Sequence, residues 1–497
     1  MPPRVSPIWP FAFGLAALLL CWFTIERHGL GMSIDAITYV STARNLLEGR
    51  GYYDSVQEPV AAWGPMFPTL LAAIGLLGID PLASAAWVNP LAYASIVGLA
   101  SDVLRRTLAA PLLFFLGSAL CLAAAPLFLT SIFAFSEPTF TLASFVSVLA
   151  LERWIRGHKG LWFAVAAIAA ALAWTGRYIG LVSLVTGAAI VLMHARTTLF
   201  RKLHWSAGFA AIAAVPTALW LARNYQVTGT LTGGRGESSH GILETVASAL
   251  TGVAGWVCLE RFPYSAWIGA LILAAIGAAW LFAHRRDAIG PAFMPLATYL
   301  CAFLGLIVVA SSSTHSLLIP GRLIAPAYVV FVLVAVITVD AVVASFSSRL
   351  GLAGAALLMV PWLLAQGAVI VKTVDLARSK GLPYTEHAWK DVQMIAFLRE
   401  NPLRGEVWSN DPWAVYRFTG IHARIAPRPF RGFMPLEKDH GLDDFQARVA
   451  QGGENWLVWF TITRKSWIHT LPEIRAAVES EVVGSFPEGA VYRLRPR

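Results

Sequence analysis

The chain has 497 residues, of which 57% are hydrophobic and only 13% are charged. Soluble domains carry about 25% charged residues, so one soluble core of this size is excluded, and the high hydrophobicity excludes general disorder. The net charge of +9 would suggest nucleic acid in a soluble protein. In a membrane protein, basic residues gather in cytoplasmic loops facing anionic lipids, so no nucleic-acid partner is expected. The composition predicts a polytopic membrane protein.

About eleven apolar segments of the length that spans a bilayer, roughly 20 residues, follow one another along the chain. Their centres lie near residues 18, 94, 116, 145, 167, 186, 214, 274, 301, 334 and 361. The first segment, after Arg4, is similar to a signal peptide. Because no small-residue cleavage site follows it, we expect an uncleaved transmembrane helix.

Basic residues fall in alternate loops between these segments. If the N-terminus is cytoplasmic, the basic loops all lie inside, as the positive-inside rule requires. These loops carry Arg105–Arg106, Arg153/Arg156/Lys159, Arg196/Arg201/Lys202, Arg285–Arg286 and Arg349. Three long segments are then extracytoplasmic: a first outer loop of about residues 28–83, a second of about 223–263, and the C-terminal tail.

The tail is polar and alternates helical and strand patterns. The periodicity predicts helices over residues 390–398, 412–419 and 472–479, strands over 406–410 and 457–460, and a pair of strands within 482–494. This alternation predicts a small extracytoplasmic α/β domain, residues 373–497, after a transmembrane domain of residues 1–372.

The first outer loop begins with a helical pattern directly after the first span. Ser33 or Asp35 can cap a helix that ends near Gly49, and its apolar positions suit the membrane surface. Asp35 lies at the mouth of the membrane domain, and Tyr39 shares its face of the helix. From the residues alone, a simple N-cap at Asp35 followed by an interfacial linker is the favoured explanation. A second short segment with Trp63 is typical of an interfacial or re-entrant helix.

Four more charged residues are expected at the outer ends of spans. Glu137 begins the fourth span, where either a function or attraction to the helix dipole accounts for an acid. Arg177, Arg223 and Arg322 are expected on the same side, where each either binds an anion or extends into the headgroups. His315 lies in a Ser/Thr-rich loop before Arg322, where a histidine is either a further donor or merely solvated.

Short motifs accompany these residues in the order of the spans. They are Tyr39-x(4)-Arg44-Asn45-Leu46-Leu47-x-Gly49-x-Gly51 after Asp35, the turn Trp63-Gly64-Pro65, Ser136-Glu137-Pro138, Gly176-Arg177-Tyr178-Ile179-Gly180-Leu181, Leu221-Ala222-Arg223-Asn224-Tyr225-x-x-Thr228-Gly229 and Pro320-Gly321-Arg322-Leu323-x-x-Pro326. Together they resemble the GT-C superfamily of glycosyltransferases, and more narrowly its bacterial family 39-type, protein-mannosyltransferase-like members.

Two departures stand out within this resemblance. Many relatives have two adjacent acids where this chain has Asp35 and Ala36. Relatives that transfer aminoarabinose to lipid A carry a Lys-Pro-Pro turn where this chain has Trp63-Gly64-Pro65. The departures count against that substrate and against a lysine contact to the donor phosphate.

The resemblance implies a GT-C fold of about eleven helices in the bacterial inner membrane. It also implies an inverting transfer of a sugar from a polyprenyl-phosphate donor to an extracytoplasmic hydroxyl on a lipid, glycan or protein. Asp35 is then the general base, and Glu137 holds the acceptor or shares a divalent metal (Mg or Mn) with Asp35. The donor phosphate is assigned first to Arg322, with Arg177, Arg223, His315 and Tyr39 as further donor contacts and Trp63 and Arg44 on the acceptor side.

Two other functions compete with this interpretation. A membrane transporter or lipid flippase should place ionisable residues near mid-span and often shows inverted repeats. No repeat is evident, and Asp340 is the nearest to an intramembrane acid. A non-enzymatic receptor or assembly protein would make the pair Asp35 and Glu137 incidental.

Overall fold

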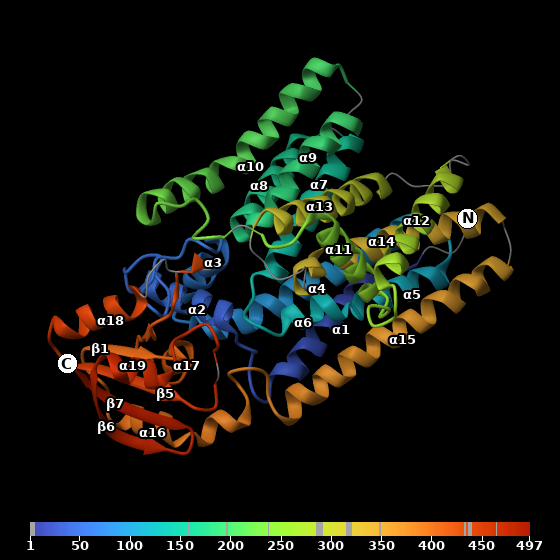
Figure 1. The fold of residues 1–497 in the computed structure, drawn as a ribbon. Helices are drawn as coiled ribbons and strands as arrows, with labels where there is room; N and C mark the ends of the chain where they lie inside the picture. Colours follow the sequence, from blue (N-terminus) through green and yellow to red (C-terminus); the bar gives the residue numbers. More distant parts are fainter. Residues whose placement is uncertain are drawn as a thin grey trace.

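A computed structural model describes residues 5–157, 159–194, 197–236, 238–284, 292–314, 321–346, 349–431, 434–435, 440–463 and 465–497. The protein is a polytopic α-helical membrane protein with a small α/β domain in its tail. In Figure 1 the tail lies against one end of the helical part, and the N-terminus lies at the far end.

The helical part is built from apolar helices of 7 to 31 residues. They are α1 (Ile8–Ile25), α4 (Pro81–Thr107), α5 (Pro111–Leu122), α6 (Ala125–Ser131), α7 (Glu137–Gly157), α8 (Gly160–Gly176), α9 (Leu181–His194), α10 (Leu199–Thr228), α11 (Ile242–Trp256), α12 (Ser265–His284), α13 (Phe293–Ser313), α14 (Gly321–Phe346) and α15 (Arg349–Ser379). Among the described residues, eight segments are long and apolar enough to cross a membrane: α1, α4, the combined residues 111–131, α10, α12, α13, α14 and α15.

The expected number of about eleven spans stays a prediction. The three predicted spans near residues 145, 167 and 186 coincide with α7, α8 and α9. The helices α8 and α9 are shorter than the others, and α7 carries Glu152, Arg153 and Arg156 in its last turns.

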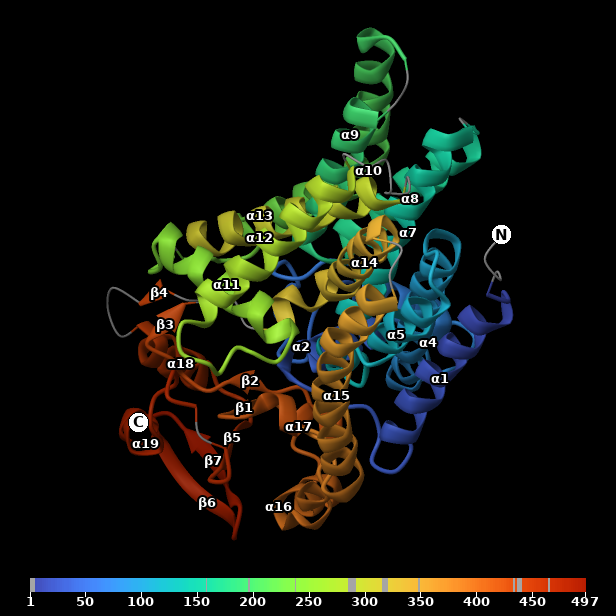
Figure 2. The same ribbon diagram turned by 90° about the vertical axis from the view of Figure 1, so that its right-hand side faces the viewer.

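Helix α14 lies at the centre of the bundle. Of its spanning segment, 78% is buried, against 11 to 61% for the other candidate spans. The residues of α14 are apolar on every face of the helix, which is typical of a helix buried inside a bundle. It packs against α4, α5, α6, α7, α11, α12, α13 and α15, and Figure 2 shows it running beside α15. From Ile324 on, the helix that carries Arg322 is therefore buried among its neighbours, while its first turn is partly exposed.

The first long loop forms two helices between α1 and α4. Helix α2 (Ile34–Leu47) begins after Ser33, whose Oγ accepts the N–H of Ala36 at 3.3 Å, and α3 (Met66–Gly75) packs against α2. We expected one face of α2 to rest on the membrane. Instead nine of its residues are buried, because α2 packs mainly against α3, and also against α4 and the tail helix α17 (Pro412–Thr419). The tail therefore contributes to covering the loop.

The tail contains a five-stranded sheet in the order β2-β1-β5-β7-β6. β1 (Glu406–Ser409) runs parallel to β2 (Arg424–Ile425) and β5 (Asn455–Phe460), while β7 (Gly489–Arg495) runs antiparallel to β5 and β6 (Glu479–Phe486). The other elements are the 3-10 helix η2 (His387–Asp391), α16 (Gln393–Glu400), α18 (His440–Ala450), α19 (Leu471–Ala477) and the short pair β3 (Phe430–Arg431) and β4 (Met434–Pro435).

The predicted tail elements match this sheet closely. The expected helices over 390–398, 412–419 and 472–479 correspond to η2 with α16, to α17 and to α19. The expected strands correspond to β1, β5, β6 and β7. The predicted domain boundary at residue 372 falls within α15, which continues to Ser379.

Asp340, the acid nearest to an intramembrane position, has a structural role. Its Oδ2 accepts the N–H of Ala109 at 2.9 Å, and its Oδ1 accepts the N–H of Ala110 at 3.1 Å. These N–H groups lie at the start of α5, where a helix has no internal partner for them. Asp340 therefore caps a neighbouring helix, which accounts for its charge without ion transport.

Replacing Asp340 with alanine should destabilise the protein by about 0.5–2 kcal/mol, the usual cost of losing a helix cap. The thermal unfolding midpoint in detergent measures this. Asp102→Ala is the matched control, since Asp102 pairs with Arg105 and Arg106 at a partly exposed position and should matter less. Equal midpoints for the two variants would contradict the capping role.

Candidate functional site

Asp35 lies in the first turn of α2 and faces the first turn of α14. Its Oδ2 pairs with Nη1 of Arg322 at 2.8 Å, and its Oδ1 accepts the indole N–H of Trp63 at 3.3 Å. Ser33, and not Asp35, provides the N-cap of α2. The carboxylate of Asp35 is therefore not used as a cap and pairs with Arg322 and Trp63 instead. The side chain is 29% exposed, so it remains accessible from outside.

Glu137, the first residue of α7, is buried beside the same arginine. Its Oε1 accepts from Nε of Arg322 at 2.5 Å and pairs with Nη1 of Arg177 at 3.0 Å. Its side chain is 1% exposed, and its Oε2 has no hydrogen-bond partner among the described residues. A carboxylate at this depth requires opposite charge, and the two guanidinium groups supply it.

Two hydroxyl groups extend the cluster. The hydroxyl of Tyr39 lies 3.0 Å from Oγ of Ser136, which also accepts from Nη1 of Arg177 at 3.3 Å. Tyr39 is buried, and its ring packs edge-on against Phe67. The structure thus places Tyr39 behind the cluster, where it orients Ser136.

The position of Arg322 is unfavourable in isolation. It lies in the first turn of α14, where the helix dipole favours anions over cations. Two carboxylates and the ring of Phe135, whose centroid is 3.6 Å from the guanidinium carbon, offset this. Arg322 therefore joins three segments that are distant in the sequence, namely α2, the start of α7 and α14.

The turn that carries Trp63 packs closely on α8. A Cβ at Gly64 would lie 2.1 Å from the carbonyl oxygen of Thr175, two residues before Arg177. Only glycine fits there, so the turn and the end of α8 approach each other directly. This contact fixes the backbone next to Trp63, and the indole N–H of Trp63 donates to Asp35.

Two predicted site residues make their contacts elsewhere. Arg223, on α10, donates to the backbone oxygens of Val60 at 2.7 Å and Tyr52 at 3.2 Å. Arg44, at the end of α2, pairs with Asp80 at 2.9 Å. Both stabilise the first loop. His315 lies outside the described residues.

Arg235 is a further cation that sequence reasoning missed. It lies in the Gly-rich segment after α10, and its Nη2 donates to the backbone oxygen of Ala62 at 3.3 Å. Its guanidinium lies over the ring of Tyr178, with its carbon 5.5 Å from the centroid. Arg223 and Arg235 thus hold the turn of the first loop just before Trp63. The Gly-rich sequence around Arg235 carries no pattern that predicts such a contact.

The tail holds the first loop from the other side. Met32, just before α2, donates its N–H to the oxygen of Pro383 at 3.0 Å. Nδ1 of His422 lies 3.1 Å from the oxygen of Ser55, and its Nε2 lies 3.2 Å from Nη1 of Arg50. The tail therefore contacts the loop both before and after α2.

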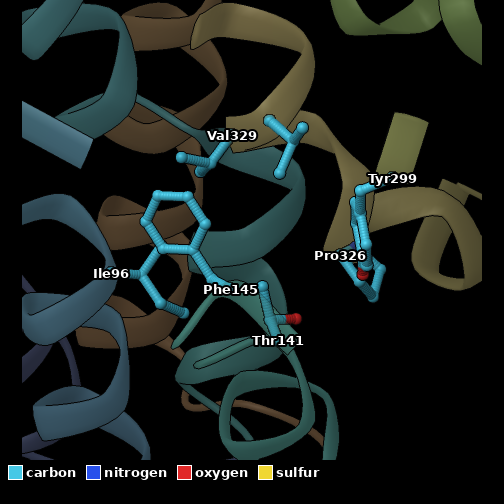
Figure 3. Close-up of a pocket in the computed structure, with 7 residues that line it drawn as sticks. Ile96, Thr141, Phe145, Tyr299, Pro326 and Val329 are labelled. Carbon is cyan, nitrogen blue, oxygen red and sulfur yellow. The ribbon is translucent and has the colours of Figure 1, made fainter. Parts of the chain in front are cut away.

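A small apolar pocket lies inside the bundle, between α4, α7, α13 and α14 (Figure 3). Thr141 and Phe145 lie one and two turns after Glu137 on α7, and Pro326 lies one turn after Arg322 on α14. Its lining is Ile96, Thr141, Phe145, Tyr299, Pro326, Val329 and Val330. On both α7 and α14, the face that carries a charged residue in the first turn of the helix therefore lines the pocket one or two turns further along.

Comparison with known proteins shows a likeness in structure only. No protein-family model matches the sequence, and no curated protein matches it either. Among solved structures, ArnT from Cupriavidus metallidurans in the apo state matches with a TM-score of 0.63 and 13% identity, over 98% of this chain and 97% of that chain. ArnT bound to undecaprenyl phosphate matches with a TM-score of 0.58 and 13% identity, over 98% of both chains.

An archaeal oligosaccharyltransferase, AglB from Archaeoglobus fulgidus in complex with an inhibitory peptide and a dolichol-phosphate, matches with a TM-score of 0.53 and 12% identity. The match covers 97% of this chain and 74% of that chain. The chain has the GT-C fold. The GT-C likeness to ArnT includes the tail, since both chains are covered almost completely.

Gly64→Ala should destabilise the protein by about 1–3 kcal/mol, the usual cost of overpacking, because the added Cβ collides with backbone that cannot move aside. The thermal unfolding midpoint measures the effect. Gly234→Ala is the control, because a Cβ at Gly234 meets nothing within 4 Å. A Gly64→Ala protein as stable as the control would contradict the close approach.

The contact between His422 and the first loop should weaken in acid. Burial lowers the pKa of His422, so the folded state favours the neutral ring, which accepts from Arg50 and donates to Ser55. Stability from this group is present above its unfolded pKa of about 6.5 and is lost as pH falls through the lower folded value. The nearby charged groups are Arg50 and Glu48.

His422→Gln tests this, because an amide makes both hydrogen bonds without titrating. We expect the unfolding midpoint of the wild type to fall relative to that of the variant between pH 7.5 and 5.5. Burial also raises the pKa of neighbouring Asp54 to about 7, which acts in the opposite direction, so only the difference between the two proteins isolates His422. A constant difference would rule out the histidine contribution.

Proposed function

We propose that the protein is a glycosyltransferase that moves a sugar from a polyprenyl-phosphate donor to an acceptor hydroxyl by inverting displacement. The observation that carries this proposal is the cluster of Asp35, Glu137, Arg177 and Arg322 at one end of a GT-C bundle. It combines a partly exposed carboxylate with two guanidinium groups, at the ends of two helices, α7 and α14, that line an apolar pocket one turn further along. One structural neighbour is bound to undecaprenyl phosphate and another to a dolichol-phosphate.

Asp35 is the general base in this proposal. It is 29% exposed, whereas Glu137 is buried, so Asp35 is the acid that reaches an acceptor. The acceptor oxygen forms a bond to the anomeric carbon as the bond from that carbon to the phosphate oxygen breaks. The proton passes to Asp35, and the electron pair leaves with the phosphate. General-base assistance of this kind contributes about 10²–10⁴-fold.

The two arginines stabilise the departing phosphate. A guanidinium carries five N–H donors, and the bonds of Arg322 to the two acids use its Nε and Nη1. Charge developing on the phosphate is stabilised by such preorganised donors. Glu137 serves to hold Arg177 and Arg322 in place, rather than to hold the acceptor.

The loop charges support an orientation with a cytoplasmic N-terminus. In this orientation the cluster and the tail both lie outside the bacterial inner membrane, where the acceptor is a lipid, glycan or protein hydroxyl. The transporter or flippase alternative receives less support, because Asp340 caps α5 and the four charged site residues lie at helix ends.

Asp35→Asn should lower turnover of a polyprenyl-phosphate sugar by about 10²–10⁴-fold, since the amide cannot take the proton. The assay offers a panel of such donors to protein in nanodiscs and follows release of polyprenyl phosphate. Asp80→Asn is the control, because Asp80 is an exposed acid of the same loop that pairs with Arg44. It should keep activity near that of the wild type.

Equal loss in both variants would point to damage to the loop rather than to the loss of a base. Full turnover by the Asp35→Asn protein would remove Asp35 from the mechanism. If no donor in the panel is turned over or bound by the wild type, the transferase proposal fails, and lipid transport is the next activity to measure.

A further inference from the structure

Two carboxylates of the site converge on a single cation. Oδ2 of Asp35 and Oε1 of Glu137 lie 2.8 Å from Nη1 and 2.5 Å from Nε of Arg322. The sequence leaves two roles open for Glu137, to hold the acceptor or to share an Mg or Mn ion with Asp35. In the structure, a guanidinium lies where such a bridging ion would lie.

The surrounding donors do not fit a divalent metal. Mg²⁺ and Mn²⁺ favour octahedral sets of oxygen ligands. Among the described residues, no group of three or more His, Cys, Asp or Glu side chains gathers in a way that could hold an ion. The nearest further groups are the guanidinium of Arg177, which pairs with Glu137, and the indole N–H of Trp63, which binds Asp35. Neither of them is a metal ligand.

The net charge of the cluster also disfavours a divalent metal ion. Asp35 and Glu137 carry two negative charges, and Arg177 and Arg322 carry two positive charges, all linked by the ion pairs described. The four groups therefore sum to zero. A divalent ion entering this cluster would gain no excess negative charge and would lie close to two fixed cations.

We propose that Arg322 takes the place of a divalent metal, so that the shared cation of this site is a guanidinium. This inference rests on the proposed function for its chemistry: Arg322 supplies the positive charge that a metal would bring to the departing phosphate. Its planar fork is part of the role, because Nε meets one acid and Nη1 meets the other. The compact ammonium of a lysine has no such spacing.

Metal binding can be measured without any turnover. Mn²⁺ is titrated against the full-length protein in detergent and followed by electron paramagnetic resonance, with and without undecaprenyl phosphate. We expect wild type, Asp35→Asn and Glu137→Gln to bind Mn²⁺ alike, and only weakly. One Mn²⁺ per wild-type chain, weakened tenfold or more in Glu137→Gln, would overturn the proposal.

The guanidinium role has its own test in protein freed of metal by a chelator. Arg322→Lys should weaken binding of undecaprenyl phosphate by about tenfold or more, the equivalent of losing one charge-assisted hydrogen bond. Arg378→Lys is the control, because Arg378 pairs with Glu26 on the surface outside this cluster. It should bind as the wild type does.

The two proposals fail in different ways. Equal binding by Arg322→Lys and the wild type, or wild-type binding that requires added Mn²⁺, would overturn the guanidinium role. If the wild type does not bind undecaprenyl phosphate with or without metal, the proposed function fails, while the Mn²⁺ titration of the lipid-free protein still decides the nature of the cation.

Discussion

The compensation of buried charge around Arg322 is the constraint on which the site depends. Glu137 is almost completely buried, and Arg322 starts a helix whose dipole disfavours a cation. Each group is stabilised by the other, and Arg177 and Asp35 add to this compensation. Because Arg322 also pairs with Asp35, this requirement places the first loop against the bundle and sets the position of the proposed base.

The rest of the fold holds this arrangement from several sides. The buried helix α14 gives Arg322 a rigid support. Arg223 and Arg235 bind the loop backbone from the bundle side, and the tail binds it through Pro383 and His422. The proposed base thus lies on a loop whose backbone is fixed by contacts with elements from α10 to the tail. These contacts explain how Asp35 can be partly exposed and still have a fixed position.

The end of the bundle at which the site lies, and most elements of the tail, could be predicted because they follow from local sequence patterns and from the order of the spans. Span length and loop charge place Asp35, Glu137, Arg177 and Arg322 at one end, and periodicity predicts most tail elements. The pairing was not predictable, since helix packing decides that Arg322 meets both acids while Arg223 binds backbone. The helix α18 and the two-residue strand β2 were also missed. Strand β2 is too short to show a period, whereas Leu442, Phe445 and Val449 of α18 recur at helical spacing, so this helix was predictable.

A structure of the protein with undecaprenyl phosphate, determined by cryo-electron microscopy in nanodiscs, tests the central claim most directly. The account predicts the lipid phosphate within hydrogen-bonding distance of Arg322, no metal between Asp35 and Glu137, and the carboxylate of Asp35 facing the phosphate from the open side. A phosphate bound away from Arg322, or a metal ion held by the two acids, would contradict it.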